Sequence, residues 1–185
     1  MNARLFLALS PALFLIALAL FPAQASEGDF TGPWRIQTAS QEQAEKALRK
    51  AQRSLRRGQG QSVLRALVLP ETTLDLAIEG PEVRFHFDGK SRPTLYTDGR
   101  PSVIDAQNPI LRYAAWEGDV LYVERTNNSG TRIEEQWRLI APTAPREGAA
   151  APPGPWLEAQ FTVRNALLEE PLTLRLIAER PAAQP

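Results

Sequence analysis

The sequence contains no cysteine and a single histidine, His86, and these shortages exclude much catalytic and metal chemistry. Without cysteine there are no disulfides, so the hydrophobic core alone must hold the fold. A cysteine nucleophile is excluded, and the common zinc sites need several nitrogen or sulfur ligands. A Ser-His-acid triad would have to use His86, and the Gly-x-Ser-x-Gly motif is absent. We therefore predict a protein that is not an enzyme and holds no metal and no cofactor.

The sequence also lacks an excess of charge of either sign. It has 21 Lys and Arg against 21 Asp and Glu, whereas a nucleic-acid-binding protein needs a basic excess. Two carboxylates, Glu124 and Glu135, would approach each other across neighbouring strands. Nearby basic residues are expected to pair with them as a charge ladder on a solvated face, which argues against a catalytic carboxylate pair. These basic residues are Arg125, Arg132 and Arg138.

Residues 1–25 are typical of a cleavable secretory signal peptide. Arg4 supplies the basic start, an apolar run follows from Leu5 to Phe21, and Pro22-Ala23-Gln24-Ala25 ends in the small residues of a cleavage site. The alternative is an uncleaved anchor, for which the apolar run is barely long enough. We predict export to the periplasm or the extracellular space of a bacterial envelope, with no transmembrane segment after removal of the leader. Residues 26–180 then form one domain, followed by a disordered tail at 181–185.

Residues 40–57 have the pattern of an amphipathic helix. Ser40 is the expected N-cap, Ala44 and Leu48 belong to an apolar stripe with helical spacing, and Gly58 is the expected stop. The other face is basic, which suggests contact with an acidic partner or with anionic lipid headgroups. The alternative is a helix whose alanine-rich stripe packs on a sheet while its charges face water. The basic residues are Lys46, Arg49, Lys50, Arg53, Arg56 and Arg57.

From about residue 72 the hydrophobic period changes to two, which predicts strands separated by tight turns such as Asp88-Gly89. The expected fold is mainly β: an antiparallel meander that forms an up-and-down barrel or a strongly curved sheet of about seven or eight strands, with one helix near its start. Strands are expected within residues 72–178. A Pro/Ala-rich loop occupies 141–155, and Val63 to Leu69 is either another strand or a segment that docks the helix.

Eight aromatic residues are candidates for the lining of a ligand cavity. A barrel of about eight strands is just wide enough to be packed with side chains or to hold one small ligand, and aromatic residues on strands serve either arrangement. Both alternatives remain open at this point. The residues are Trp34, Phe85, Phe87, Tyr96, Tyr113, Trp116, Trp137 and Phe161.

Two parts of the sequence resemble known proteins. Phe30-Thr31-Gly32-Pro33-Trp34 is similar to the Gly-x-Trp start of the first strand in lipocalins and lipocalin-like barrels. The stretch from Thr72 to Leu139 resembles a group of uncharacterised secreted bacterial proteins, through Asp98-Gly99, the run Trp116 to Glu124, and Trp137-Arg138-Leu139. The resemblance implies a soluble β domain that binds a small apolar ligand, and it implies no reaction. An envelope interaction protein that uses the basic helix is the alternative.

Overall fold

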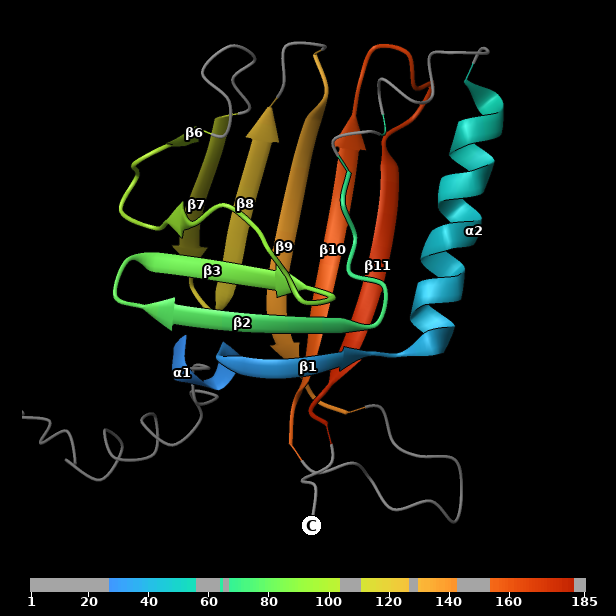
Figure 1. Ribbon diagram of the computed structural model, residues 1–185. Coiled ribbons are helices and arrows are strands. Elements are labelled where there is room, and N and C mark those ends of the chain that lie inside the picture. The colour runs from blue at the N-terminus through green and yellow to red at the C-terminus, as the bar shows by residue number, and fades with distance from the viewer. Residues whose placement is uncertain are drawn as a thin grey trace, which may run out of the picture.

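The computed structural model describes residues 27–55, 64, 67–103, 111–126, 130–142 and 154–181. Figure 1 shows one curled sheet with a long helix along one side. The predicted leader, most of the 141–155 loop, and Arg56 and Arg57 of the basic helix lie outside the described residues.

Within this part of the chain, the strands form an antiparallel sheet in the order β4-β3-β2-β1-β11-β10-β9-β8-β7-β6, and β5 pairs with β3. The helices are α1 (Glu27–Phe30) and α2 (Thr38–Ser54). The strands are β1 (Gly32–Ile36), β2 (Thr73–Glu79), β3 (Glu82–Phe87), β4 (Lys90–Ser91), β5 (Leu95–Tyr96), β6 (Ser102–Val103), β7 (Leu111–Glu117), β8 (Val120–Thr126), β9 (Arg132–Ile140), β10 (Trp156–Arg164) and β11 (Leu172–Glu179). The prediction of a mainly β, strongly curved antiparallel sheet with one amphipathic helix is confirmed.

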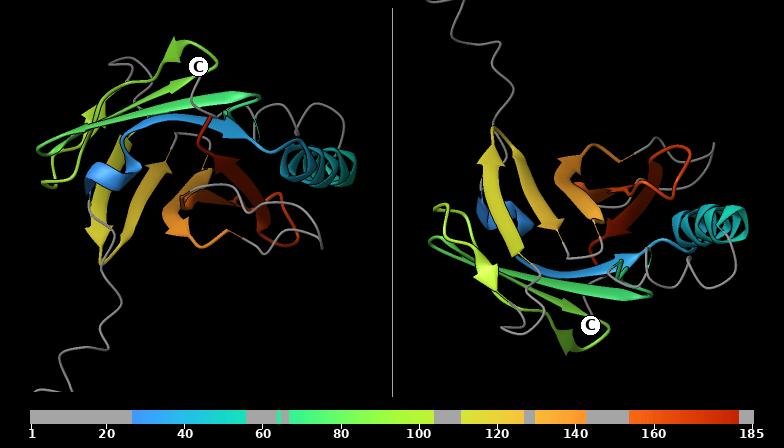
Figure 2. Two further views of the ribbon diagram at one scale, coloured as in Figure 1. Left: turned by 90° about the horizontal axis from the view of Figure 1, so that it is seen from below. Right: turned by 90° about the horizontal axis from the view of Figure 1, so that it is seen from above.

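The sheet curls into a half-barrel. The long strands β7 to β11 form one wall, and β1, β2 and β3 cross in front of one half of that wall (Figures 1 and 2). The segment from β5 to β6 contacts both ends of the sheet, because β5 pairs with β3 and β6 pairs with β7. The hydroxyl of Ser102 donates to the Thr94 carbonyl within this segment. The short strands β5 and β6 therefore connect the two ends of the curl.

The core fills the half of the curl that β1 to β3 cover. Inward-facing residues follow the period of two that predicted the strands, as in β3, where Val83, Phe85 and Phe87 are buried. The Trp137 ring lies at the centre of the aromatic group, with centroid distances of 4.9 Å to Phe85 and 5.5 Å to Phe161. Aromatic contacts at these distances stabilise the fold beyond the area that they bury.

The helix α2 is fixed to β11 by Ser40, which is not the N-cap that the sequence predicted. The helix begins at Thr38 after Gln37. The Ser40 hydroxyl donates to the Gln37 carbonyl at 2.8 Å and accepts from the backbone N–H of Ile177 at 3.0 Å. Ser40 therefore satisfies a polar group of the sheet instead of capping the helix. The apolar side of α2 packs inward, and Ala44 is buried.

The segment before β2 docks against α2, which resolves one of the open alternatives. Leu67 and Leu69 are partly buried against the core, and Leu64 packs in a second apolar cluster with Leu55 at the end of the helix. In the described portion, residues 67–70 have no strand pairing. The described part of the segment that follows α2 in the chain and precedes β2 therefore packs on the core without joining the sheet.

The Gly-x-Trp motif has a clear steric explanation. The Trp34 indole N–H donates to the Phe30 carbonyl at 2.9 Å, and the Arg180 guanidinium lies 3.8 Å from the centroid of the Trp34 ring. Arg180 also donates to the Asp29 carbonyl at 2.6 Å. Gly32 has a φ of 114°, and a Cβ atom there would lie 2.8 Å from Nη1 of Arg180. A side chain at Gly32 would therefore displace Arg180 from the tryptophan.

Candidate functional site

Most of the predicted cavity aromatics come together as a packed core. Five of the eight are buried, Trp116 packs against them, and Tyr96 is partly buried under Arg100. Tyr113 is 45% exposed because its neighbours Arg112 and Ala114 face inward. Tyr113 therefore lies on the outer face of the sheet, away from the other candidates. The five buried residues are Trp34, Phe85, Phe87, Trp137 and Phe161. Their ring contacts indicate a filled interior at this end of the curl.

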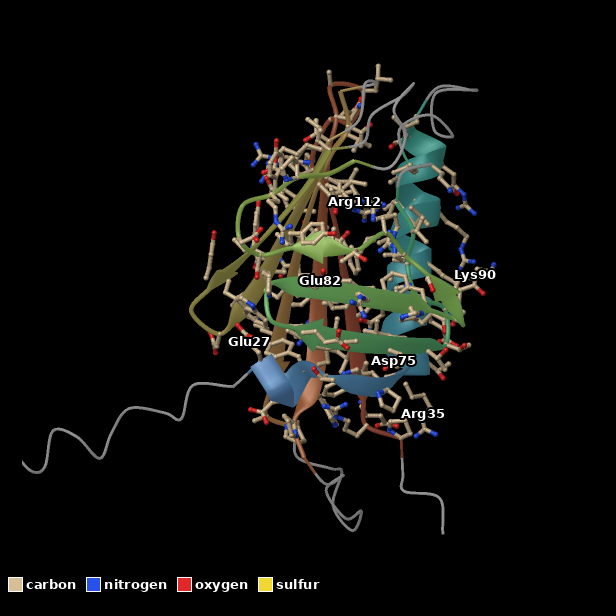
Figure 3. The ribbon with its side chains drawn as sticks, turned by 60° about the vertical axis from the view of Figure 1, so that its left-hand side comes forward. Glu27, Arg35, Asp75, Glu82, Lys90 and Arg112 are labelled. Carbon is tan, nitrogen blue, oxygen red and sulfur yellow. The ribbon has the colours of Figure 1, made fainter. Side chains whose placement is uncertain are left out.

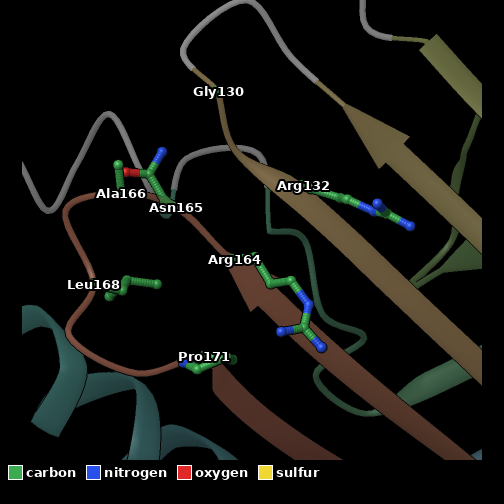
Figure 4. A pocket seen from close by; sticks show the side chains of 7 residues that line it. All are labelled: Gly130, Arg132, Arg164, Asn165, Ala166, Leu168 and Pro171. Carbon is green, nitrogen blue, oxygen red and sulfur yellow. The ribbon is translucent and has the colours of Figure 1, made fainter.

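The outer face of β8 to β10 carries one pair of the charge ladder that the sequence predicted, Arg132 with Glu124, whereas Arg138 pairs with Glu158 and not with Glu124 or Glu135. Arg132 lies 2.9 Å from the Glu124 carboxylate and 3.1 Å from Glu134, and Arg164 lies 3.6 Å from Glu134. A pocket of about 310 Å³ lies beside them, but Figure 4 shows both guanidinium groups pointing away from Asn165 and Leu168. Because their charges are neutralised by glutamates on the solvated face, this pocket offers no distinctive chemistry.

Arg125 and Glu135 do not belong to that ladder, and the prediction of a solvated position for them is wrong. Their side chains pair on the inner face and are each 3% exposed. The strand register explains this burial. Glu135 lies opposite Val123, so both side chains point to the inner face, and Arg125, two residues after Val123 on β8, points to the same face. Paired strands thus bring a buried ion pair to the inner face, where Glu135 also accepts a hydrogen bond from the Trp137 indole at 3.2 Å.

Two further arginines approach this ion pair. Arg112, on β7, lies directly opposite Arg125 in the strand pairing and is 8% exposed. Arg92 follows β4, and its guanidinium lies 4.4 Å from the centroid of the Phe87 ring. We refer to Arg92, Arg112, Arg125 and Glu135 as the arginine cluster. Figure 3 places Arg112 on the side of β3 away from β1.

The arginine cluster carries more positive than negative charge. Burial, and then the charges of Arg125 and Arg92, lower the pKa of Arg112 to about 9, and burial lowers the pKa of Arg92 to about 10. Glu135 is the acid that opposes both shifts. Nε of Arg112 and Nη2 of Arg92 are buried with no hydrogen-bond partner among the described residues. Such donors are costly when left unsatisfied, so the cluster has the electrostatic character of an anion site.

A pocket of about 340 Å³ opens onto the two unsatisfied arginines. One wall is the segment before β2, the other is the turn between β3 and β4, and Arg92 and Arg112 lie at its inner side. Its apolar lining comes from Val68, Leu69, Phe87 and Pro93, and its polar lining from Glu71, Asp88, Lys90, Ser91, Arg92 and Arg112.

Asp88 holds the two walls of this pocket together. Its carboxylate accepts backbone N–H groups of Glu71 at 2.8 Å, Thr72 at 2.8 Å and Thr73 at 2.9 Å. Burial raises the pKa of Asp88, but these hydrogen bonds outweigh it and lower the pKa to about 2. The charged carboxylate is therefore a structural tie between the β3–β4 turn and the segment before β2.

The basic face of α2 is exposed, as expected. Lys46, Lys50 and Arg53 point to solvent, and Arg49 forms an i,i+4 ion pair with Glu45 at 3.2 Å. Neither described helix is long and apolar enough to cross a membrane. These charges lie on the side of α2 away from the arginine cluster and form a separate surface.

Comparisons with known proteins give no further assignment. No family model matches the chain, and no curated protein matches it. Within the ranges that the structure describes, no group of three or more His, Cys, Asp or Glu side chains is arranged to hold a metal ion. The arginine cluster is the feature that sequence reasoning missed. The sequence did contain a signal for it, because residues two apart on a strand share a face. Arg125 shares its face with the apolar Leu121 and Val123, and Glu135 shares its face with Trp137.

Proposed function

We propose that this chain is an exported, non-enzymatic β domain that binds one small ligand with an apolar body. The observation that carries the proposal is the pocket of about 340 Å³ between the segment before β2 and the β3–β4 turn. Its volume falls at the lower end of the range for small-molecule sites, about 300–1,000 Å³, which combine an apolar lining with a few polar groups. The packed aromatic core supports placing the ligand at this open end and not at the centre of the sheet.

A direct test uses octanol as a neutral apolar probe in isothermal titration calorimetry, together with native mass spectrometry of protein purified from its own compartment. We expect octanol to bind with one site. Val68 lines the pocket and is 48% exposed, so Val68→Lys should weaken binding without unfolding the domain. Leu167 is 46% exposed and lies outside this pocket, so Leu167→Lys is the matched control. Absence of octanol binding and of any co-purifying molecule would contradict the proposal.

Export follows from the predicted leader. The expected result is a mature N-terminus at about Ser26 in protein recovered from the periplasm or the medium. N-terminal sequencing of the recovered protein tests this, and recovery of the uncleaved chain in the membrane fraction would contradict it.

A second candidate function is contact between α2 and an acidic partner or an anionic membrane surface. The observation that favours it is the row of Lys46, Lys50 and Arg53, which is exposed and has no ion pair with any described residue. Reversal of all three residues to Glu should abolish binding to phosphatidylglycerol vesicles. The control changes Lys46 and Lys50 to Arg and Arg53 to Lys, and it should retain binding. Equal binding by the two triple variants would exclude this function.

A further inference from the structure

The charge balance of the arginine cluster points to the chemistry of the ligand's headgroup. Arg125 and Glu135 neutralise each other as a buried pair. Arg92 and Arg112 form no ion pair with a described residue, and both line the pocket. Of the two carboxylates that also line it, Asp88 is occupied by backbone N–H groups and the charge of Glu71 is balanced by that of Lys90. An excess of buried positive charge lowers the stability of a fold, because burial removes water from a charged group and like charges repel.

We infer that the ligand is an amphiphile with an anionic oxyacid headgroup, either a carboxylate or a phosphate monoester, and that Arg92 and Arg112 bind this headgroup. The inference rests on the proposed function, since it concerns the same pocket. The unsatisfied Nη2 of Arg92 and Nε of Arg112 would donate to the anionic oxygens. The apolar chain would then lie against Val68, Leu69 and Pro93 toward solvent.

The positions of the lining residues explain why the headgroup of the ligand, and not its apolar chain, would lie at the inner side of the pocket. Phe87 lies beneath the Arg92 guanidinium at 4.4 Å and fixes its plane. Arg112 is held by its strand opposite Arg125. The exposed lining residue Val68 lies in the segment before β2, at the solvent side of the pocket. An anionic group would therefore be enclosed by fixed donors while the chain covers apolar surface.

The test compares octanoic acid, octyl phosphate and octanol by calorimetry at neutral pH, because these probes share one chain and differ in the headgroup. We expect at least one anionic probe to bind about tenfold or more tightly than octanol, since hydrogen bonds to charged groups are the stronger ones. The tighter of the two anionic probes identifies the headgroup. Arg112→Met and Arg92→Met should each reduce the ratio of anionic-probe affinity to octanol affinity. Arg164→Met, on the outer face, should change neither.

The outcomes separate the two proposals. Equal binding of all three probes would overturn the headgroup inference and leave the proposed function standing. Binding of inorganic phosphate as tight as that of octyl phosphate would also overturn it, because the chain would then contribute nothing. Failure of all three probes would remove the proposed function and the inference with it. If Arg112→Met does not fold, Arg92→Met carries the test, since Arg92 is only partly buried.

Discussion

Two neighbouring arginines should respond in opposite directions to the same substitution. Arg112 and Arg125 lie opposite each other on β7 and β8, and both are buried. Arg125 is paired with Glu135, whereas Arg112 has no hydrogen bond to a described residue that offsets its burial. We predict that Arg112→Met stabilises the ligand-free protein and that Arg125→Met destabilises it.

The magnitudes follow from the charges on the inner face. The lowering of the pKa of Arg112 from the ordinary arginine value to about 9 corresponds to an upper limit of about 5 kcal/mol of unfavourable free energy in the folded state. Replacing buried charges with apolar side chains of similar size has stabilised proteins by roughly 1–4 kcal/mol. We therefore expect Arg112→Met to raise the free energy of unfolding by about 1–3 kcal/mol, or about 2–4 °C in Tm for each kcal/mol.

Arg125→Met has the opposite effect because it removes the ion-pair partner of Glu135, which keeps only the hydrogen bond from the Trp137 indole and the nearby charges of Arg92 and Arg112. Breaking a buried pair by removal of one partner costs about 3–5 kcal/mol. Urea unfolding of the wild type and both variants, followed by tryptophan fluorescence, measures the two free energies on one scale. If Arg112→Met is as destabilising as Arg125→Met, Arg112 must already be satisfied in the ligand-free protein. The reasoning behind the anionic headgroup would then fail.

Three further predictions concern stability. For Asp88, the folded pKa of about 2 lies below the usual 3.8, so its contribution is present above about pH 3.8 and is lost as the pH falls through about 2. Asp88→Asn should cost about 1–2 kcal/mol in urea unfolding at pH 7, a difference that disappears near pH 2; a constant difference would refute the carboxylate tie. Trp137→Ala should cost about 3–5 kcal/mol in the same assay, and a cost below about 1 kcal/mol would contradict its place at the centre of the core. Gly32→Ala should lower Tm by several degrees because a φ of 114° is strained for alanine and its Cβ would also displace Arg180, whereas an unchanged Tm would show that neither effect has a cost.

The period-two pattern was sufficient to predict the long strands but not β4 and β6. β2, β3 and β7 to β11 have six to nine residues each, and buried positions recur at a spacing of two along most of their length, although β10 and β11 each contain three consecutive buried residues. β4, β5 and β6 have two residues each, and two residues carry no period. The connection between the ends of the curl therefore depends on long-range contacts that no local pattern contains.

The position of Ser40 shows a similar limit. Serine before an apolar stripe is the usual N-cap signal, and the helix does begin in this region. Its actual start at Thr38 is set by a hydrogen bond between Ser40 and Ile177, a residue 137 positions later in the chain. Tertiary contact overrides local preference here, as it does at many helix ends.

The inner face of β9 shows how one strand contributes both to the core and to the candidate site. Trp137 lies among aromatic rings at one end, and Glu135, two residues away on the same face, lies among arginines. The phase of the strand places both side chains on the inner face, whereas the charge of Glu135 suggested a solvated position. A charge at an inward phase, diagonal to another inward charge on the paired strand, is therefore better interpreted as a candidate site. The Trp137 indole N–H donates to Oε2 of Glu135 at 3.2 Å and so joins the core to the arginine cluster. Trp137→Ala should therefore lower both stability and probe affinity, whereas Arg112→Met should raise stability and reduce the preference for an anionic headgroup.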